Sequence, residues 1–334
     1  MEKLKLLWVD NPDFKTTRSL VDYFSNHPDI EFVHDMYADP AKMAWADVIW
    51  MEWIEYASQI ASHRVYNDQN KYLWNDAENR FGAGAERRWD KAKLILRGID
   101  IDILYGHFRG VKWENVDHLL FIAPHIKEYA YRGSTTIPSS VPVDVIPLGI
   151  DTSKYTFRDR SGAGNRRVAV IHHCWSGKNL PLLAQAIAAL VKKTDRSWFF
   201  HMVGTWSNEA WLPEYFWHIC EKLGIKDLIR WDSRVGDMDA FLEDFGYSIS
   251  ASSKEAFSLT MAEAAAKGIK PLMHHWNGAK DLWPEYMVWD TIDEFVEKML
   301  EPIDSKKYRQ DVEKYDINKL IPRFEEIIRS SRRV

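Results

Sequence analysis

The sequence is poor in cysteine and carries no excess of positive charge. Only two cysteines, Cys174 and Cys220, occur in 334 residues, and they lack the spacing of a zinc site or a disulfide framework. We therefore expect a reduced protein of the cell interior. The formal net charge of −5 argues against a chain that wraps nucleic acid, although a local basic patch would be hidden in that sum.

Long apolar runs and glycine-rich phosphate-binding motifs are missing as well. No apolar run approaches the roughly 18 residues that a membrane-spanning helix needs. The N-terminal segment "MEKLKLLWVDNP" has a short apolar run and no cleavage-site pattern, so we expect a first strand rather than a signal peptide, and a cytoplasmic protein. We find no P-loop, no nucleophile elbow and no Gly-x-Gly-x-x-Gly motif that follows a convincing strand.

Short apolar, β-branched runs alternate with longer amphipathic stretches through most of the sequence. Strands are expected at 4–9, 30–33, 47–51, 93–97, 118–123, 143–147, 168–172, 197–203, 227–231, 246–250 and 269–273. Helices are expected at 16–26, 54–66, 179–193, 208–223, 237–244 and 259–267. Strands that alternate with helices predict an α/β fold whose parallel sheets carry helices on both faces.

A polar segment that contains glycine, "LGIDTSKYTFRDRSGAGNRR" at 148–167, separates two such blocks. We interpret it as a linker between two Rossmann-like domains that face each other across a cleft. The predicted division is a first domain at 1–150 and a second domain at 151–300. The C-terminal helices are expected in 301–334.

The stretch "GYSISASSKEAFSLTMAEAAAKG", residues 246–268, predicts a strand, a loop and a helix that ends at Gly268. Its loop leaves the carboxyl end of the strand, where open parallel sheets bind their ligands. The backbone N–H groups of Phe257, Ser258 and Leu259 would then suit a phosphate at the helix N-terminus.

The same stretch also has a purely structural interpretation. Ser258 or Thr260 could be the N-cap of the helix, with "TMAE" as a capping box in which Glu263 reaches back to a backbone N–H group. Glu255 would then be a solvated loop residue. The local pattern alone does not choose between the two interpretations.

Three segments, in order, resemble the retaining glycosyltransferases of the GT-B fold (glycosyltransferase group 1, family 4-like). "VIPLGIDTSKYTF" at 145–157 is similar to the interdomain segment of that family, and "VAVIHHCWSGKNLPLLAQAIAAL" at 168–190 is similar to the strand, basic loop and helix that open its second domain. The third segment is the pair Glu255 and Glu263 with the strand that follows, in which Pro271 falls two residues later than usual. The first domain matches the family only in architecture. The resemblance implies that the C-terminal helices of 301–334, with the terminal helix at roughly 316–333, cross back to the first domain.

The resemblance implies a donor site in the second domain. Glu255 matches a glutamate that binds hydroxyls of the donor sugar, and Glu263 matches one that binds the ribose hydroxyls of the nucleotide. Lys178 matches the lysine that neutralises the diphosphate leaving group. The loop whose amides hold the diphosphate corresponds to Ala256, Phe257, Ser258 and Leu259. Charge builds on the diphosphate as the glycosidic bond breaks, so these groups would act mainly on the transition state.

The chain departs from the family at one position of this site. The family usually has an arginine five residues before the lysine, and this chain has His173 there. A histidine supplies charge only when it is protonated, so a phosphate contact from His173 would be weak or would depend on pH. The alternative is a histidine that packs beside the site without touching the phosphate.

The acceptor site is less well marked, because the glycine-rich loop that often follows the first strand of the family is replaced by "VDNPDFKTT". Asp10 and Asn11 at the end of that strand are acceptor-binding candidates, or they cap the helix expected at 16–26. Asp100, which follows the strand at 93–97, and His107, in "LYGHFRGVKW", are two further candidates. His107 could equally be an ordinary loop histidine.

The resemblance therefore implies a retaining glycosyltransferase that moves a sugar from a nucleoside-diphosphate sugar to an unidentified acceptor. It implies no metal and no other cofactor, since the nucleotide sugar is a co-substrate. Two alternatives remain open. The chain could glycosylate a modified base in DNA, as phage enzymes of this fold do, or it could bind a nucleotide sugar without turnover.

Overall fold

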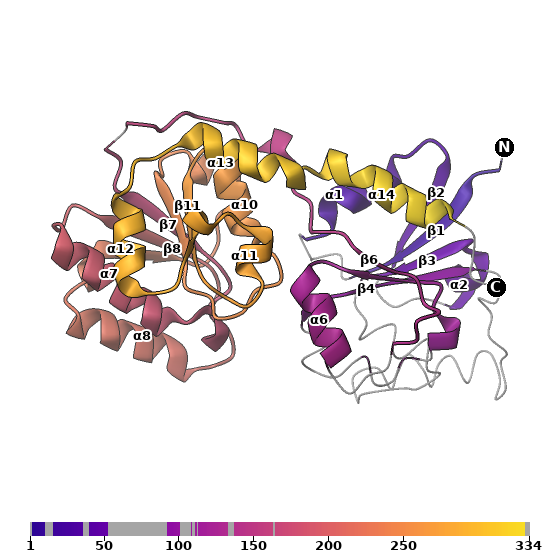
Figure 1. Ribbon diagram of the computed structural model, residues 1–334, viewed down its shortest axis with the longest axis horizontal. Coiled ribbons are helices and arrows are strands. Elements are labelled where there is room, and N and C mark those ends of the chain that lie inside the picture. Colours follow the sequence, from indigo (N-terminus) through magenta and orange to yellow (C-terminus); the bar gives the residue numbers. More distant parts are fainter. Residues whose placement is uncertain are drawn as a thin grey trace. The chain divides into compact units, whose positions relative to one another are not determined.

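The computed structural model describes residues 2–10, 16–35, 40–52, 92–100, 108, 111, 113–132, 137–162 and 164–330 (Figure 1). The chain forms two units, one made of Met1–Gly149 with Ile317–Val334 and the other of Ile150–Asp316. Each unit is built on a six-stranded sheet in the described part of the chain, and the paired strands are parallel. The predicted α/β fold with two Rossmann-like sheets is confirmed.

The first sheet follows the predicted strands closely. Its strands are β1 (Leu4–Val9), β2 (Ile30–Asp35), β3 (Val48–Met51), β4 (Lys93–Gly98), β5 (His118–Phe121) and β6 (Val143–Val145), in the order β2-β1-β3-β4-β5-β6. The described helices of this unit are α1 (Arg18–Ser25), α2 (Pro40–Trp45), α6 (Pro124–Arg132) and α14 (Ile317–Arg329), with a 3-10 turn at Trp113–Asn115. The helix expected at 54–66 lies outside the described residues.

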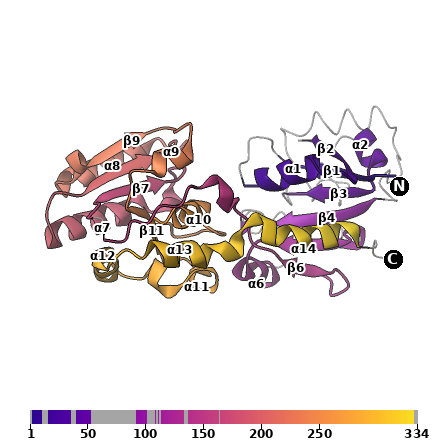
Figure 2. The same ribbon diagram turned by 90° about the horizontal axis from the view of Figure 1, so that it is seen from above.

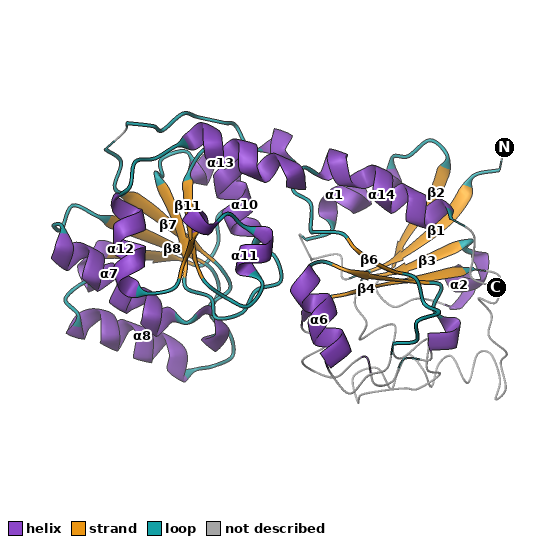
Figure 3. Ribbon diagram, viewed as in Figure 1, coloured by secondary structure: helices purple, strands orange, loops and turns teal. Residues whose placement is uncertain are grey.

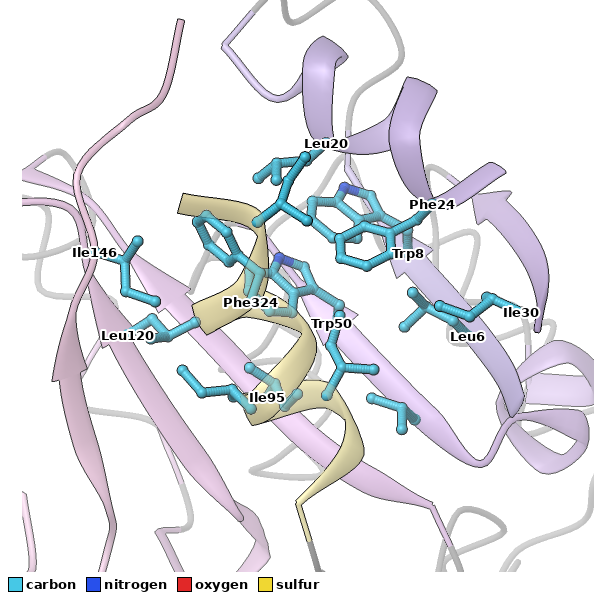
Figure 4. Packing of buried hydrophobic residues seen from close by; sticks show 14 of the residues in the cluster. Leu6, Trp8, Leu20, Phe24, Ile30, Trp50, Ile95, Leu120, Ile146 and Phe324 are labelled. Carbon is cyan, nitrogen blue, oxygen red and sulfur yellow. The ribbon is translucent and has the colours of Figure 1, made fainter. Parts of the chain in front are cut away.

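Aromatic side chains make the centre of the first unit's core (Figure 4). Trp8 of β1 and Trp50 of β3 stack with their ring centroids 4.7 Å apart. Phe24 of α1 lies 6.0 Å from Trp8, and Phe324 of α14 lies 5.7 Å from Trp50. Side chains of a strand alternate between the two faces of a sheet, so one set of strand positions meets both helices. The last helix of the chain therefore completes a core that the first strand begins.

The helices after residue 300 are divided between the two units, so the predicted return to the first domain is confirmed for the terminal helix, expected at roughly 316–333, and is wrong for the rest of 301–334. Helix α13 (Ser305–Val312) belongs to the second unit, where the Ser305 hydroxyl donates to the carbonyl of Gly268 at 2.6 Å. Only α14 returns to the first unit. The ammonium of Lys93, at the start of β4, donates to the carbonyls of Ile327 and Ser330 and so holds the last turn of α14.

The second sheet also matches the predicted strands, and helices lie on both of its faces (Figure 3). Its strands are β7 (Arg167–Ile171), β8 (Phe199–Val203), β9 (Ile229–Asp232), β10 (Tyr247–Ser250), β11 (Lys270–His274) and β12 (Val288–Trp289). The described helices are α7 (Leu180–Lys193), α8 (Trp211–Lys222), α9 (Met238–Leu242), α10 (Leu259–Ala266), α11 (Ala279–Leu282), α12 (Ile292–Leu300) and α13 (Figure 2). Short 3-10 turns lie at Thr152–Lys154, Ser176–Lys178, Lys226–Leu228, Glu285–Met287 and Glu313–Tyr315.

The segment predicted as a linker, 148–167, is anchored to the second unit rather than free. The buried guanidinium of Arg160 donates to the carbonyl oxygens of Phe245 at 2.8 Å and of Glu243 at 3.1 Å, and it also donates to the carbonyl of Lys267. Burial lowers the pKa of Arg160, but the carbonyl oxygens satisfy its N–H groups. One arginine thus fastens the segment to the ends of α9 and α10.

Candidate active site

The order of strands in the second sheet marks one edge as a ligand site. The order is β12-β11-β10-β7-β8-β9, so the chain moves outward from β7 in one direction and from β10 in the other. The loops that leave the carboxyl ends of β7 and β10 therefore diverge, and open α/β sheets bind ligands at such a switch point. Both loops carry residues that the sequence analysis selected.

Lys178 and Glu255 meet across this switch point. Lys178 ends the 3-10 turn after β7, Glu255 lies in the loop after β10, and the ammonium of Lys178 donates to Glu255 Oε1. Their side chains are 14% and 18% exposed, so both charges remain within reach of a ligand. The structure thus brings together the two charges that the sequence analysis assigned to the donor, a phosphate-binding cation and a sugar-binding carboxylate.

Contacts between the two loops fix this pair. The backbone N–H group and the hydroxyl of Ser253 both donate to the carbonyl of Gly177 at 3.0 Å. Gly177 has no room for a side chain, because a Cβ atom would collide with the ring of Trp175. The ammonium of Lys254 lies over that ring, 5.7 Å from its centroid. Residues on either side of the switch point are therefore tied together by backbone and aromatic contacts.

The helix after β10 begins at a residue in the left-handed conformation. Ser258, the N-cap of α10, has φ +71° and makes no capping hydrogen bond with its side chain. Because α10 begins at Leu259, Glu263 is the fifth helical residue rather than the third. The capping-box interpretation of Glu263 is therefore wrong. A helix start without a side-chain cap keeps its first N–H groups available for an anion.

The loop at 256–259, whose amides were predicted to hold the diphosphate, is fixed by contacts of Phe257. Phe257 is buried, its carbonyl accepts a hydrogen bond from Trp283 Nε1 at 2.9 Å, and its ring packs 4.8 Å from that of Tyr315. Ala256 and Leu259 on either side are half-buried. Phe257 anchors the loop through its ring, which leaves the neighbouring backbone as the part that can meet a ligand.

Glu263 has a partner that the sequence analysis did not foresee. The phenol of Tyr155, just after the 3-10 turn Thr152–Lys154, hydrogen bonds to the Glu263 carboxylate. Burial, and then the negative charge of Glu263, raise the pKa of Tyr155. Tyr155 belongs to "IPLGIDTSKYTF", which the resemblance selected without assigning a role to Tyr155, and nothing in that segment indicates which carboxylate the tyrosine meets.

His173 lies on the loop that carries Lys178. Its side chain is exposed, and its Nδ1 atom pairs with the hydroxyl of Thr205 at 3.0 Å. This contact orients the ring toward the loop after β8. The phosphate contact predicted from the position of His173 stays a prediction.

The acceptor candidates of the first unit differ in their accessibility. Asp10 is fully buried and accepts a hydrogen bond from the hydroxyl of Thr17, the residue before α1. As it stands in the structure, its carboxylate supports the start of α1 and is covered by the protein. Asp100 is half-buried. Asn11 and His107 lie outside the described residues.

A buried ion pair beside Asp10 escaped the sequence analysis. Glu52, directly after β3, accepts hydrogen bonds from Arg97 Nη1 at 2.7 Å and from Trp50 Nε1 at 2.8 Å. Burial raises the pKa of Glu52 to about 7, Arg97 opposes the rise and the charge of Asp10 adds to it. A carboxylate placed directly after an apolar strand was the available signal, in "VIWME".

Comparison with solved structures defines the class of fold. HepE of Anabaena, solved with UDP and glucose, shares 13% identity over 97% of this chain and 99% of its own, with a TM-score of 0.70. The lipopolysaccharide outer core galactosyltransferase WaaB shares 13% identity over 98% of this chain and 99% of its own, with a TM-score of 0.65. A glycosyltransferase of Rickettsia africae shares 12% over 98% of each chain, with a TM-score of 0.64. The fold is GT-B.

A family model matches most of the second unit. Residues 154–319 match the model of the family described as glycosyl transferases group 1. This segment is a glycosyltransferase group 1 domain, and the protein is a glycosyltransferase. No curated protein matches the chain.

Two further observations concern metals and membranes. Among the described residues, no group of histidine, cysteine, aspartate and glutamate side chains is arranged to hold a metal ion. No helix in the described part of the chain has the length and apolar character needed to cross a bilayer.

Proposed function

We propose that this glycosyltransferase transfers a sugar, with retention at the anomeric carbon, from a nucleoside-diphosphate sugar bound by the second unit to an acceptor bound by the first. The observation that carries the proposal is the meeting of Lys178 and Glu255 at the switch point between β7 and β10. We call these two residues and the first turn of α10 the candidate donor site. Retention rests on the resemblance of the Glu255 to Glu263 segment to retaining enzymes.

The proposed site supplies positive charge where the donor gains negative charge. In the proposal, the diphosphate replaces Glu255 as the partner of Lys178, and it also meets the N–H groups that open α10. Glu255 is then free to accept hydrogen bonds from sugar hydroxyls. Glu263 leaves Tyr155 and accepts hydrogen bonds from the ribose. The proposal uses no metal ion, because Lys178 and the helix N-terminus together face the phosphates.

The proposed transfer balances without a protein nucleophile. The bond between C1 of the sugar and the phosphate oxygen breaks, and its electron pair stays on that oxygen. The acceptor hydroxyl bonds to C1 on the face that the phosphate leaves, and its proton passes to the departing phosphate. Lys178 stabilises the charge that builds on the diphosphate in the transition state, so its loss should reduce kcat as well as donor binding.

A thermal-shift screen tests the donor site. The protein is incubated with UDP, GDP, ADP, CMP and their common sugar conjugates, and the shift is compared with that of Lys178→Met. A ligand at 100 times its Kd adds about 2.7 kcal/mol to the stability of the native state, which is easily seen. HepE was solved with UDP, so the uridine nucleotides are tested first. We expect one nucleoside diphosphate to stabilise the wild type and to lose this effect in Lys178→Met.

The matched control is Lys192→Met. Lys192 is an exposed lysine in the last turn of α7, away from the carboxyl edge of the sheet, and its loss should leave the ligand-induced shift unchanged. If every nucleotide leaves the melting temperature of the folded wild type unchanged, the proposal fails. If a nucleotide sugar binds but its sugar is never released to water or to an acceptor, the protein is a binding module and the proposed transfer is wrong.

A further inference from the structure

Two histidines at the carboxyl edge of the second sheet have buried ring nitrogens without partners. Both nitrogens of His172 and Nδ1 of His274 are shielded from solvent and make no hydrogen bond in the part of the chain that the structure describes. His172 directly follows β7, and His274 is the last residue of β11. A buried polar atom without a hydrogen-bond partner lowers stability, so three such atoms at one edge of a sheet suggest a function that offsets this cost.

The strand register places the two rings on the same face of the sheet, one on either side of β10. Tyr247 of β10 pairs with Val168 of β7 and with Lys270 of β11. Continued at the same register, Ala251 falls opposite both His172 and His274. Residues that pair in parallel strands point to the same face. A small alanine thus separates the two imidazoles.

Both rings border the candidate donor site. The charge of Lys178 acts on His172, and the backbone of Ser252, in the loop that carries Glu255, hydrogen bonds to the ring of His274. Each histidine is partly exposed as a whole residue, although its unpaired nitrogens are shielded from solvent, and the ring centroid of His274 lies 4.6 Å from that of Trp289. A small rotation of either ring would present its unpaired nitrogens to a ligand held at Lys178 and Glu255.

Both imidazoles are held in their neutral form. Burial, with the nearby charge of Lys178, lowers the pKa of His172 to about 3, and burial lowers the pKa of His274. A neutral imidazole has one N–H donor and one acceptor nitrogen, which is also the pattern of a hydroxyl group. A phosphate offers acceptors only, and Lys178 with the start of α10 already serves it. The matching chemistry is therefore a group that is rich in hydroxyls.

We propose that His172 and His274 form a neutral polar wall that hydrogen bonds to hydroxyl groups of the sugar being transferred and so selects among nucleotide sugars that share one base. This inference rests on the proposed function, because it needs a nucleotide sugar in the candidate donor site. It assigns the two histidines to the sugar rather than to the nucleotide. The recognition of the nucleotide and of its sugar is then carried by different side chains.

The experiment compares the affinity of a nucleotide with that of its sugar conjugate. Kd values for UDP, UDP-glucose, UDP-galactose and UDP-N-acetylglucosamine are measured by calorimetry on the wild type, His172→Leu and His274→Leu. If GDP or ADP is the nucleotide that binds, GDP-mannose or ADP-glucose is measured beside it. Leucine keeps the bulk of the ring without its hydrogen bonds. We expect each variant to bind UDP as the wild type does and to bind its preferred sugar conjugate about three- to tenfold more weakly.

Further variants separate this role from a structural one. His172→Gln and His274→Gln keep a neutral donor and acceptor and should recover part of the lost affinity. His218→Leu, at an exposed position of α8, should change no Kd. Because both nitrogens of His172 lack a partner among the described residues, His172→Leu should melt no lower than the wild type, whereas His274→Leu loses the hydrogen bond with the backbone of Ser252 and should melt slightly lower.

The possible failures can be told apart. If no nucleoside diphosphate binds the wild type, the proposed function is wrong and the histidine assignment falls with it. If UDP or another nucleotide binds, but the ratio of its Kd to that of its sugar conjugate is the same in the leucine variants as in the wild type, the donor site stands and the histidine wall is wrong. An equal loss of affinity for the nucleotide and for its sugar conjugate would also contradict the assignment of the two histidines to the sugar.

Discussion

The charged pair Glu52 and Arg97 of the first unit is covered more deeply than the pair Lys178 and Glu255 of the candidate donor site. Glu52 is 3% exposed and Arg97 is fully buried, whereas Lys178 and Glu255 keep contact with solvent. A buried carboxylate loses its hydration, and a single cation does not always repay that loss. For Glu52 the balance falls on the side of the neutral form, and its pKa rises to about 7. Burial, rather than the ion pair, therefore decides its titration.

The raised pKa of Glu52 predicts a pH dependence of stability. The folded protein holds a proton on Glu52 that the unfolded chain releases near the ordinary value of 4.5. The stability due to this group is therefore fully present below pH 4.5 and is lost as the pH rises through about 7. Between those values it can change the free energy of unfolding by as much as about 1.4 kcal/mol per pH unit.

The measurement is urea unfolding of the wild type and of Glu52→Gln from pH 4.5 to pH 8. Glutamine keeps the shape of the side chain and cannot ionise. As the pH rises, we therefore expect the free energy of unfolding of the variant to increase relative to that of the wild type. Glu297→Gln, an exposed position of α12, should follow the wild type at every pH. Parallel curves for the wild type and Glu52→Gln would show that Glu52 stays ionised beside Arg97.

At the scale of elements, two helix starts of the second unit share an unusual backbone. Asn179 before α7 and Ser258 before α10 are the residues other than glycine with positive φ in the described part of the chain. They follow β7 and β10, the two strands of the switch point. Such strain persists where the surroundings impose it, and it gathers at functional sites. Both helices thus start without a side-chain cap at the edge where we place the donor.

The strain at Ser258 predicts an effect of glycine that is opposite to the usual one. A left-handed residue with a side chain costs about 1–2 kcal/mol, and glycine avoids most of that cost while the unfolded chain gains entropy. We expect Ser258→Gly to raise the free energy of unfolding by about 0.5–1 kcal/mol. Ser25→Gly, at the last residue of α1, should lower it by a similar amount. Equal losses in both variants would contradict the argument from strain.

The elements near the site show what could be predicted and what could not. The alternation of apolar runs located β7 and β10, because a buried strand needs a continuous apolar stretch. The start of α10 was placed wrongly by the capping-box alternative, because "TMAE" is a local pattern and the helix start depends on distant contacts. Phe257 is held by Trp283 and Tyr315, far along the chain, and this anchor fixes where the loop ends.

The same limit applies to the partners of the site residues. The resemblance to the glycosyltransferase family selected Lys178, Glu255 and Glu263. Spacing could not show that Tyr155 meets Glu263, or that the nitrogens of His172 are left without partners. Those facts depend on side-chain packing between segments that are distant in sequence, which no local pattern records.

At the scale of the whole molecule, the chain leaves the first unit once and comes back to it. It passes into the second unit after Gly149 and returns at Ile317, and these two residues touch so closely that a Cβ atom at Gly149 would collide with the Ile317 side chain. Helix α14 has an apolar face that is buried on the first sheet. The resemblance implied that the terminal helix, roughly 316–333, crosses back to the first domain, and α14 does so. The resemblance did not predict that α13 would stay behind in the second unit.

The return of α14 predicts that a substitution near the C-terminus weakens the first unit. Phe324 is fully buried, packs on Trp50 and faces the guanidinium of Arg97, 5.4 Å from its ring centroid. Phe324→Ala should cost about 3–5 kcal/mol, the usual loss for a buried phenylalanine. Leu300→Ala, at the end of α12 where the side chain is 47% exposed, is the matched control and should cost far less.

Hydrogen exchange shows where that loss falls. In Phe324→Ala, the amides of β1, β3 and β4 should exchange faster than in the wild type, because their core has lost the helix that covers it. The amides of β7 and β10 should keep their protection, since the second unit has its own core and does not contain α14. Faster exchange in β7 and β10, with no change in β1 and β3, would show that α14 stabilises the second unit and would contradict the prediction.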